Sequence, residues 1–171
     1  MSFADAVRTG FQKYVVFSGR ASRPEFWYWI LFTILVAVAF NIIESVLNIR
    51  VGIVRALFNL AVFLPGLAVS VRRLHDTGRS GWFLLILYVP WIVGFVFLGV
   101  GLGLGIAAAF TGTSEGAGSG TLAFAGAALV SALIGAVLCL GGFAFSIYVM
   151  AKRGDLVANA YGPPPVSTPI A

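Results

Sequence analysis

The side chains of this sequence that could do chemistry gather in two short polar segments, residues 17–27 and 72–82. The second segment contains the only histidine, His75, followed directly by Asp76. A histidine–carboxylate pair can bind a metal or relay a proton, but there is no second histidine, and the only cysteine, Cys139, lies in an apolar run. We therefore expect a structural or headgroup-binding role for this pair, and no metal or cofactor.

A serine nucleophile is the other chemistry that the second segment suggests. Ser80 lies in Gly78-Arg79-Ser80-Gly81, the G-x-S-G form of some intramembrane proteases. No histidine follows Ser80 to act as its base, and His75 lies five residues upstream in the same segment. Ser80 is interpreted more simply as the cap of the next helix, so the sequence predicts no enzyme.

Arginine dominates the charge of both polar segments. Glu25 and Asp76 can each pair with a nearby arginine, because paired charges are cheaper than isolated ones at a membrane interface. The arginines could also hold anionic lipid headgroups, at about 1 kcal/mol for each basic residue. The candidate rim for ion pairs, lipid contacts or partner contacts consists of Arg20, Arg23, Glu25, Arg72, Arg73, His75, Asp76 and Arg79.

Long apolar runs must position these residues. Of the 171 residues, 60% are hydrophobic and only 10% are charged, whereas a soluble domain carries about 25% charged residues. Four runs are each long enough for the roughly 20 residues that a helix needs to cross a bilayer, and their continuity excludes spanning strands. The sequence predicts an all-α polytopic membrane protein. Its transmembrane helices are expected at about residues 26–49, 51–71, 82–110 and 121–151.

The basic residues alternate across these runs and so indicate sidedness. Four precede the first run, three lie between the second and third, and two follow the fourth. The remaining two lie between the first and second runs or just inside the second. The positive-inside rule places the nine on the cytoplasmic side, with both termini, at the plasma membrane. Topology thus explains the net charge of +5, and nucleic acid is not expected as a partner.

Shorter segments flank the four runs. Apolar residues recur at helical spacing before the first run: Phe3, Val7, Phe11, Tyr14 and Val15. They predict a short amphipathic helix in the membrane interface. Ser22 and Glu25 fit a capping box at the start of the first long helix. Residues 1–155 are expected to form one membrane domain, and the Pro-rich residues 156–171 a flexible cytoplasmic tail.

Polar residues are scarce inside the apolar runs. The candidates in the first two runs for a pathway or a buried pair are Asn41, Glu44, Arg55 and Asn59. Glu44 and Arg55 lie at similar distances from Arg50, at ~1.5 Å per helical residue, and so at similar depth. A structural ion pair between adjacent helices is the preferred interpretation, and a proton or ion pathway is the alternative.

Small residues dominate the last two runs. Gly101 and Gly105 repeat at four-residue spacing in the third run, as do Gly99 and Gly103. A similar stripe in the fourth run comprises Ala123, Ala127, Ser131, Gly135 and Cys139. Such stripes let helix backbones approach closely in lipid, so we expect a tight hairpin.

Three segments resemble the signatures of the DUF805 family of bacterial inner-membrane proteins. They are Phe17-Ser-Gly-Arg-Ala-Ser-Arg-Pro-Glu-Phe-Trp27, Arg72-Arg-Leu-His-Asp-Thr-Gly-Arg-Ser-Gly-Trp82 and Asn159-Ala-Tyr-Gly-Pro-Pro-Pro165. The family name denotes unknown function, so the resemblance implies a location but no catalytic residues. We expect a non-enzymatic scaffold or regulatory protein whose rim contacts lipid headgroups or a protein partner. The alternative is a small transporter or channel subunit that acts as a homo-oligomer.

Overall fold

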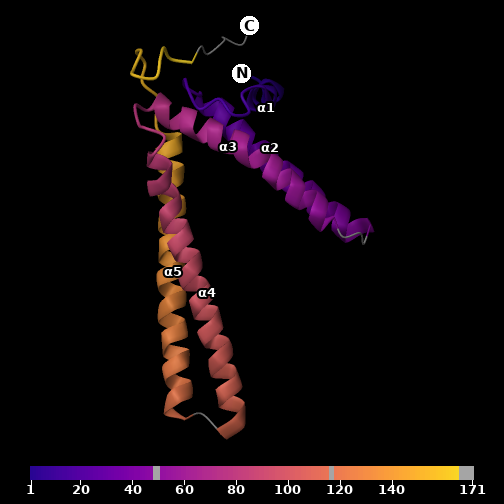
Figure 1. Cartoon of the computed structure of the whole chain (residues 1–171), viewed down its shortest axis with the longest axis vertical. Coiled ribbons are helices and arrows are strands. Elements are labelled where there is room, and N and C mark those ends of the chain that lie inside the picture. Colours follow the sequence, from indigo (N-terminus) through magenta and orange to yellow (C-terminus); the bar gives the residue numbers. More distant parts are fainter. Residues whose placement is uncertain (48–50, 116–117, 166–171) are drawn as a thin grey trace. The chain divides into compact units, whose positions relative to one another are not determined.

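The computed structural model describes residues 1–47, 51–115 and 118–165, with the side chains of 111–115 outside the description (Figure 1). This part of the chain is helical, with no strand and one isolated bridge between Asn159 and Gly162. Its helices are α1 (Phe3–Gln12), α2 (Arg23–Leu47), α3 (Gly52–Asp76), α4 (Phe83–Glu115) and α5 (Ser119–Ala151). The predictions for residues 48–50 and 166–171 lie outside the described residues.

The expected all-α fold with four long apolar helices is confirmed. Helices α2 and α3, and the stretches Phe83–Phe110 and Ser119–Ala151, are each long and apolar enough to cross a membrane. Two helices continue five residues past their apolar runs, α3 from Val71 to Asp76 and α4 from Phe110 to Glu115. The extension of α3 is possible because its charged side chains find partners, as described below.

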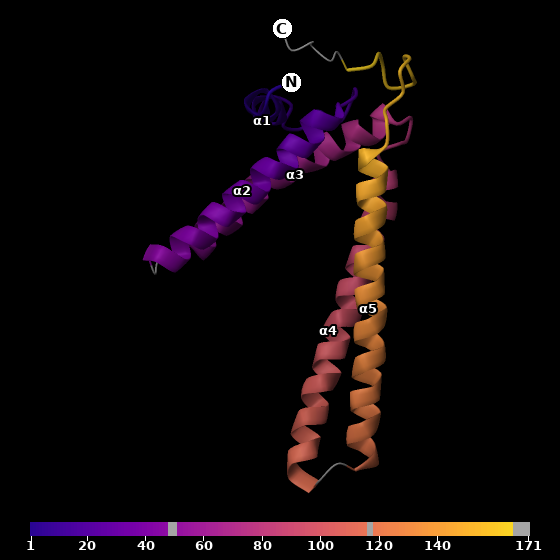
Figure 2. The same cartoon turned by 180° about the vertical axis from the view of Figure 1, so that it is seen from behind.

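One compact unit comprises Met1–Phe83 and the chain from Met150 onward. Within it α1 packs on α2 through aromatic side chains and also contacts α3. Helices α2 and α3 run side by side (Figure 2). The ring centroids of Phe11 and Trp29 are 5.2 Å apart, edge to face. Gly10 lies so close to the Trp29 ring that any side chain there would overlap it. The Tyr14 hydroxyl donates to the Ala61 carbonyl at 2.6 Å and ties the end of α1 to α3.

Helix capping differs from the sequence prediction. A complete capping box forms at α1, where Ser2 Oγ accepts from the Asp5 amide and Asp5 Oδ2 accepts from the Ser2 amide. The bonds from Ser2 lower the pKa of the Asp5 carboxyl. The box predicted at α2 forms only in part: Ser22 Oγ accepts from the Glu25 amide at 3.3 Å. The Glu25 carboxylate binds Arg72 instead.

The other compact unit, Leu84–Val149, contains most of α4 and α5. The two helices approach closely where glycines face each other's backbones. A methyl group on Gly135 would lie 2.7 Å from the Gly94 carbonyl oxygen, and one on Gly101 would lie 3.0 Å from the Ala128 carbonyl oxygen. Gly99, by contrast, faces open space. The contact surface is therefore made by part of the predicted small-residue stripes.

Enlarging Gly135 is predicted to destabilise the hairpin. Gly135→Ala should lower the free energy of unfolding by about 1–3 kcal/mol, because the added methyl group meets the α4 backbone. Thermal unfolding in a mild detergent measures this loss. Gly99→Ala is the matched control, since its methyl group meets no atom within 4 Å. Equal unfolding midpoints for the two variants would contradict the contact.

Candidate functional site

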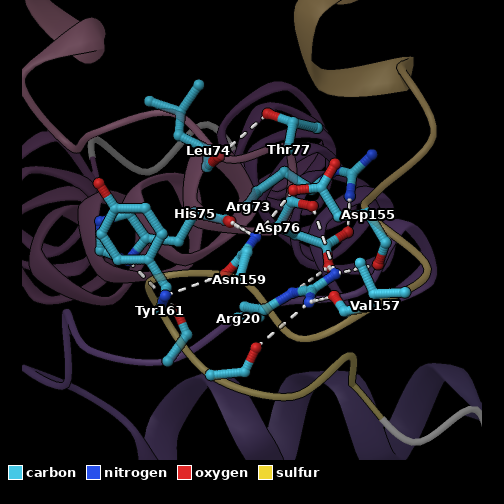
Figure 3. Close-up of polar contacts among 12 residues, drawn as sticks. Arg20, Arg73, Leu74, His75, Asp76, Thr77, Asp155, Val157, Asn159 and Tyr161 are labelled. Atoms are coloured by element: carbon cyan, nitrogen blue, oxygen red, sulfur yellow. Dashed lines mark hydrogen bonds and ion pairs between the residues drawn. The ribbon is translucent and has the colours of Figure 1, made fainter.

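Three segments of the first unit meet at one polar cluster (Figure 3). They are residues 19–25 at and before the start of α2, residues 72–79 at the end of α3, and residues 150–162, which include the last two residues of α5 and the chain after it. Gly78 lets α3 stop there, because its φ of 70° is a left-handed conformation that favours glycine. The Arg79 amide then donates to the Leu74 carbonyl and closes the turn.

Asp76 is the centre of this cluster. Its Oδ1 lies 2.8 Å from Arg20 Nη2 and accepts from Arg20 Nε at 2.9 Å, while its Oδ2 binds Arg73 Nη1. The Asp76 side chain is only 6% exposed, and those of Arg20 and Arg73 are 1% and 0% exposed. Burying these charges is tolerable because each carboxylate oxygen faces a guanidinium group.

Arg73 also caps the C-terminal end of α5. Its Nε donates to the Met150 carbonyl at 2.9 Å, and its Nη2 donates to the Lys152 carbonyl. Carbonyl groups in the last turn of a helix lack intrahelical donors and carry partial negative charge. Arg73 therefore supplies both the missing donors and a compensating positive charge.

Arg20 binds the chain that follows α5. Its guanidinium group donates to the carbonyl oxygens of Val157 at 2.9 Å, Gly162 at 3.3 Å, and Asp155. The Asp155 amide donates to the Asp76 carbonyl at 2.8 Å. A guanidinium group has five N–H donors in a fixed plane. Arg20 can therefore bind the Asp76 carboxylate and several backbone carbonyls at the same time.

A second buried pair links α2 to α3. Arg72 Nη1 donates to Glu25 Oε1 at 2.6 Å, and the two side chains are 1% and 5% exposed. The Arg72 carbonyl accepts from the Ala21 amide at 3.0 Å. Arg72 Nε and Nη2 have no hydrogen-bond partner within the described part of the chain. Glu25 therefore balances the charge of Arg72 without using all of its donors.

His75 is enclosed by the first and last segments of the cluster. Its Nδ1 lies 3.2 Å from the Gly19 carbonyl, which can only accept, so Nδ1 carries the proton. The ring stacks on Tyr161 with centroids 3.8 Å apart and planes 3° apart. Asn159 Nδ2 donates to the His75 carbonyl at 2.9 Å. No group of three or more His, Cys, Asp or Glu side chains in the described ranges could hold a metal ion.

The remaining predicted residues lie outside this network. Arg79 packs its guanidinium 4.7 Å from the centre of the Phe83 ring, and Arg23 forms no ion pair with any described residue. Glu44 and Arg55 pair at 2.8 Å between α2 and α3, with side chains about one-third exposed. Arg55 also donates to Asn41 Oδ1 at 3.2 Å. The structure thus contains the preferred ion pair between these helices.

The segment after α5 contributes more to the cluster than the sequence predicts. The sequence predicts a flexible tail from residue 156 onward, whereas Asn159 and Tyr161 contact His75, and two further carbonyls bind Arg20. Every residue has a backbone carbonyl, so the sequence does not indicate which carbonyls will bind an arginine. The only available signal was the third resembling segment, which begins at Asn159.

Residues from all three resembling segments thus meet in one cluster. The family model described as protein of unknown function, DUF805, matches residues 14–163. The chain belongs to the DUF805 family. The match covers every residue of the cluster, and it also includes the glycine- and alanine-rich helices α4 and α5. The cluster is therefore part of a DUF805 domain.

Similar sequences come from Escherichia coli. The inner membrane protein YhaI of strain K12 is 44% identical over 89 residues, which are 50% of this chain and 75% of YhaI. The inner membrane protein YhaH is 38% identical over 93 residues, 50% of this chain and 77% of YhaH. No solved structure matches the chain. Together with the four apolar helices, these relatives identify the chain as an integral membrane protein.

Removing the charge of Asp76 is predicted to be severely destabilising. Asp76→Asn leaves Arg20 and Arg73 buried without a carboxylate, and breaking a buried pair costs about 3–5 kcal/mol. Thermal unfolding in detergent measures the loss. Asp155→Asn removes the same charge, but Asp155 forms no ion pair with a described residue, so it should lose about 1 kcal/mol or less. Similar losses in both variants would show that Asp76 is not the centre of the cluster.

Removing the Tyr161 ring is predicted to loosen the segment after α5. Tyr161→Ala loses the stacking on His75, worth about 0.5–1.5 kcal/mol. The amides of residues 155–162 should then exchange with solvent several times faster, as measured by hydrogen exchange and mass spectrometry. Tyr161→Phe keeps the ring and should exchange like the wild type. Unchanged exchange in the alanine variant would mean that the stacking does not hold the segment.

Proposed function

We propose that the protein is a non-enzymatic membrane scaffold or regulatory protein. In this proposal it crosses the plasma membrane four times with both termini in the cytoplasm. Its basic rim contacts anionic lipid headgroups or a protein partner. The observation that carries the proposal is the polar cluster, whose buried charges are used to hold chain segments together.

The cluster supports a structural role more than a catalytic one. Its two buried carboxylates, Glu25 and Asp76, are both bound to arginines, and the imidazole of His75 is stacked and hydrogen-bonded. A general acid or base must reach a substrate proton, and these groups are committed to internal contacts. Basic side chains outside the ion pairs, such as Arg23 and Arg153, are more accessible and available to a partner.

Helix lengths and charge distribution support the proposed topology. α2 and α3 each contain 25 residues, or ~37 Å at 1.5 Å per residue, enough for a hydrocarbon core about 30 Å thick. In a chain with four crossings, the segments before the first run, between the second and third runs, and after the fourth run lie in one compartment. These segments contain nine of the eleven Lys and Arg residues. That compartment is the cytoplasm under the positive-inside rule.

A transporter or channel subunit is less well supported. Such a function needs a continuous polar path, supplied by intramembrane polar side chains. The polar residues Asn41, Glu44 and Arg55 lie toward one end of the α2–α3 pair, where they bond to one another. They therefore fit a local structural tie better than a pathway.

Reporter fusions are predicted to locate the chain termini and the α4–α5 connection on opposite sides. A periplasmic phosphatase reporter should be active after Gly118, and a cytoplasmic fluorescent reporter should be active at the C-terminus. This pattern follows from the absence of Lys and Arg between residues 80 and 151. Fluorescence from a fusion after Gly118 would contradict four crossings with both ends inside.

Anionic lipid is predicted to stabilise the purified protein. Its thermal midpoint should be several degrees higher in nanodiscs with phosphatidylglycerol than in pure phosphatidylcholine, because ligands of the native state stabilise it. Raising the salt concentration should reduce the difference by screening the charges. Equal midpoints in both lipids would remove the lipid half of the proposal. Cross-linking in cells would then test the protein-partner half.

A further inference from the structure

An open hollow lies beside the polar cluster, within the first compact unit. Its volume is about 930 Å³, and it lies between the start of α2 and the chain that follows α5. The charged side chains that line it are Arg23, Asp76, Arg153 and Asp155.

The hollow carries an excess of positive charge. Asp76 contributes little negative potential, because Arg20 binds one of its oxygens and Arg73 binds the other. Arg23 and Arg153 form no ion pair with the described residues. Asp155 is the one lining carboxylate without an arginine partner in the described chain, and its Oδ2 already accepts from an amide nitrogen. Four guanidinium groups therefore line the hollow or bind the Asp76 carboxylate beside it, and only two carboxylates oppose their charge.

The start of α2 adds to this potential. Ser22 and Pro24 also line the hollow, and α2 begins at Arg23. The first turn of a helix carries partial positive charge, which favours an anion nearby. This contribution is secondary to the arginines, because Ser22 Oγ already accepts from the Glu25 amide.

We propose that this hollow binds a phosphate group, with Arg23 and Arg153 as its charged ligands. Guanidinium groups bind phosphate through paired, charge-assisted hydrogen bonds. The group could belong to a lipid headgroup or to a soluble phosphate compound, since both present the same oxygens. The inference rests on the proposed function in one respect, that this rim meets anionic groups in the cytoplasm.

The test compares two double variants of the full chain. R23Q/R153Q removes two charges from the hollow, and R8Q/K13Q removes two charges from the region of α1, which does not line it. Each protein is titrated with inorganic phosphate in neutral detergent, and with phosphatidic acid in phosphatidylcholine nanodiscs. Tryptophan fluorescence reports the thermal midpoint. Affinity for phosphate should fall at least about tenfold in R23Q/R153Q and should stay near the wild-type value in R8Q/K13Q.

The outcomes separate the site from the wider proposal. If inorganic phosphate raises the thermal midpoint of the wild type but not that of R23Q/R153Q, the ligand is a soluble phosphate compound. If only phosphatidic acid raises the midpoint of the wild type, and R23Q/R153Q loses this effect, the ligand is a lipid headgroup. Both outcomes support the site. Equal weakening in the two variants would overturn the site and leave general lipid contact intact. A wild type that responds to neither ligand would overturn the site, while its response to phosphatidylglycerol would still decide the proposed function.

Discussion

The Asp76 carboxylate can be buried only because two guanidinium groups bind it, and the rest of the first unit is arranged to meet that requirement. A carboxylate in a low-dielectric environment without partners would be far too costly. Arg20 comes from the chain before α2, and Arg73 lies one helical turn before Asp76 on α3. The same two arginines have donors left over. Arg73 uses them on the end of α5 and Arg20 uses them on the chain that follows.

The helices of the two units are held together by different kinds of contact. In the first, α1 to α3 pack through large aromatic rings, and the polar cluster joins the start of α2 to the end of α3. In the second, α4 and α5 contain few polar groups and approach through glycine, so that backbone atoms are nearly in contact. Both kinds of packing suit a lipid environment. Apolar side chains gain little free energy there by moving from lipid to a helix interface, so close packing or paired charges must hold the helices together.

Much of the fold was predictable because hydrophobic length is a strong signal. The four long helices, the short first helix and the Glu44–Arg55 pairing all follow from apolar runs and residue spacing. The extension of α3 from Val71 to Asp76 was not predicted, because a run of charged residues looks like a loop until their partners are known. The role of Asn159 and Tyr161 was not predictable from periodicity, since an irregular segment has none. The cation–π contact between Arg79 and the Phe83 ring was also not predictable, because the sequence does not indicate which arginine lies over an aromatic ring.

The contacts of Arg20 also have an order in time. Arg20 is translated more than a hundred residues before its acceptors at residues 155, 157 and 162. Until the ribosome has added those residues, part of the Arg20 guanidinium must remain hydrated or bind something else. The complete network can therefore form only after synthesis of the last long helix. Full bonding of this arginine therefore requires that the chain has been made at least as far as Gly162, and a chain that stops before Asp155 would leave these donors without their acceptors.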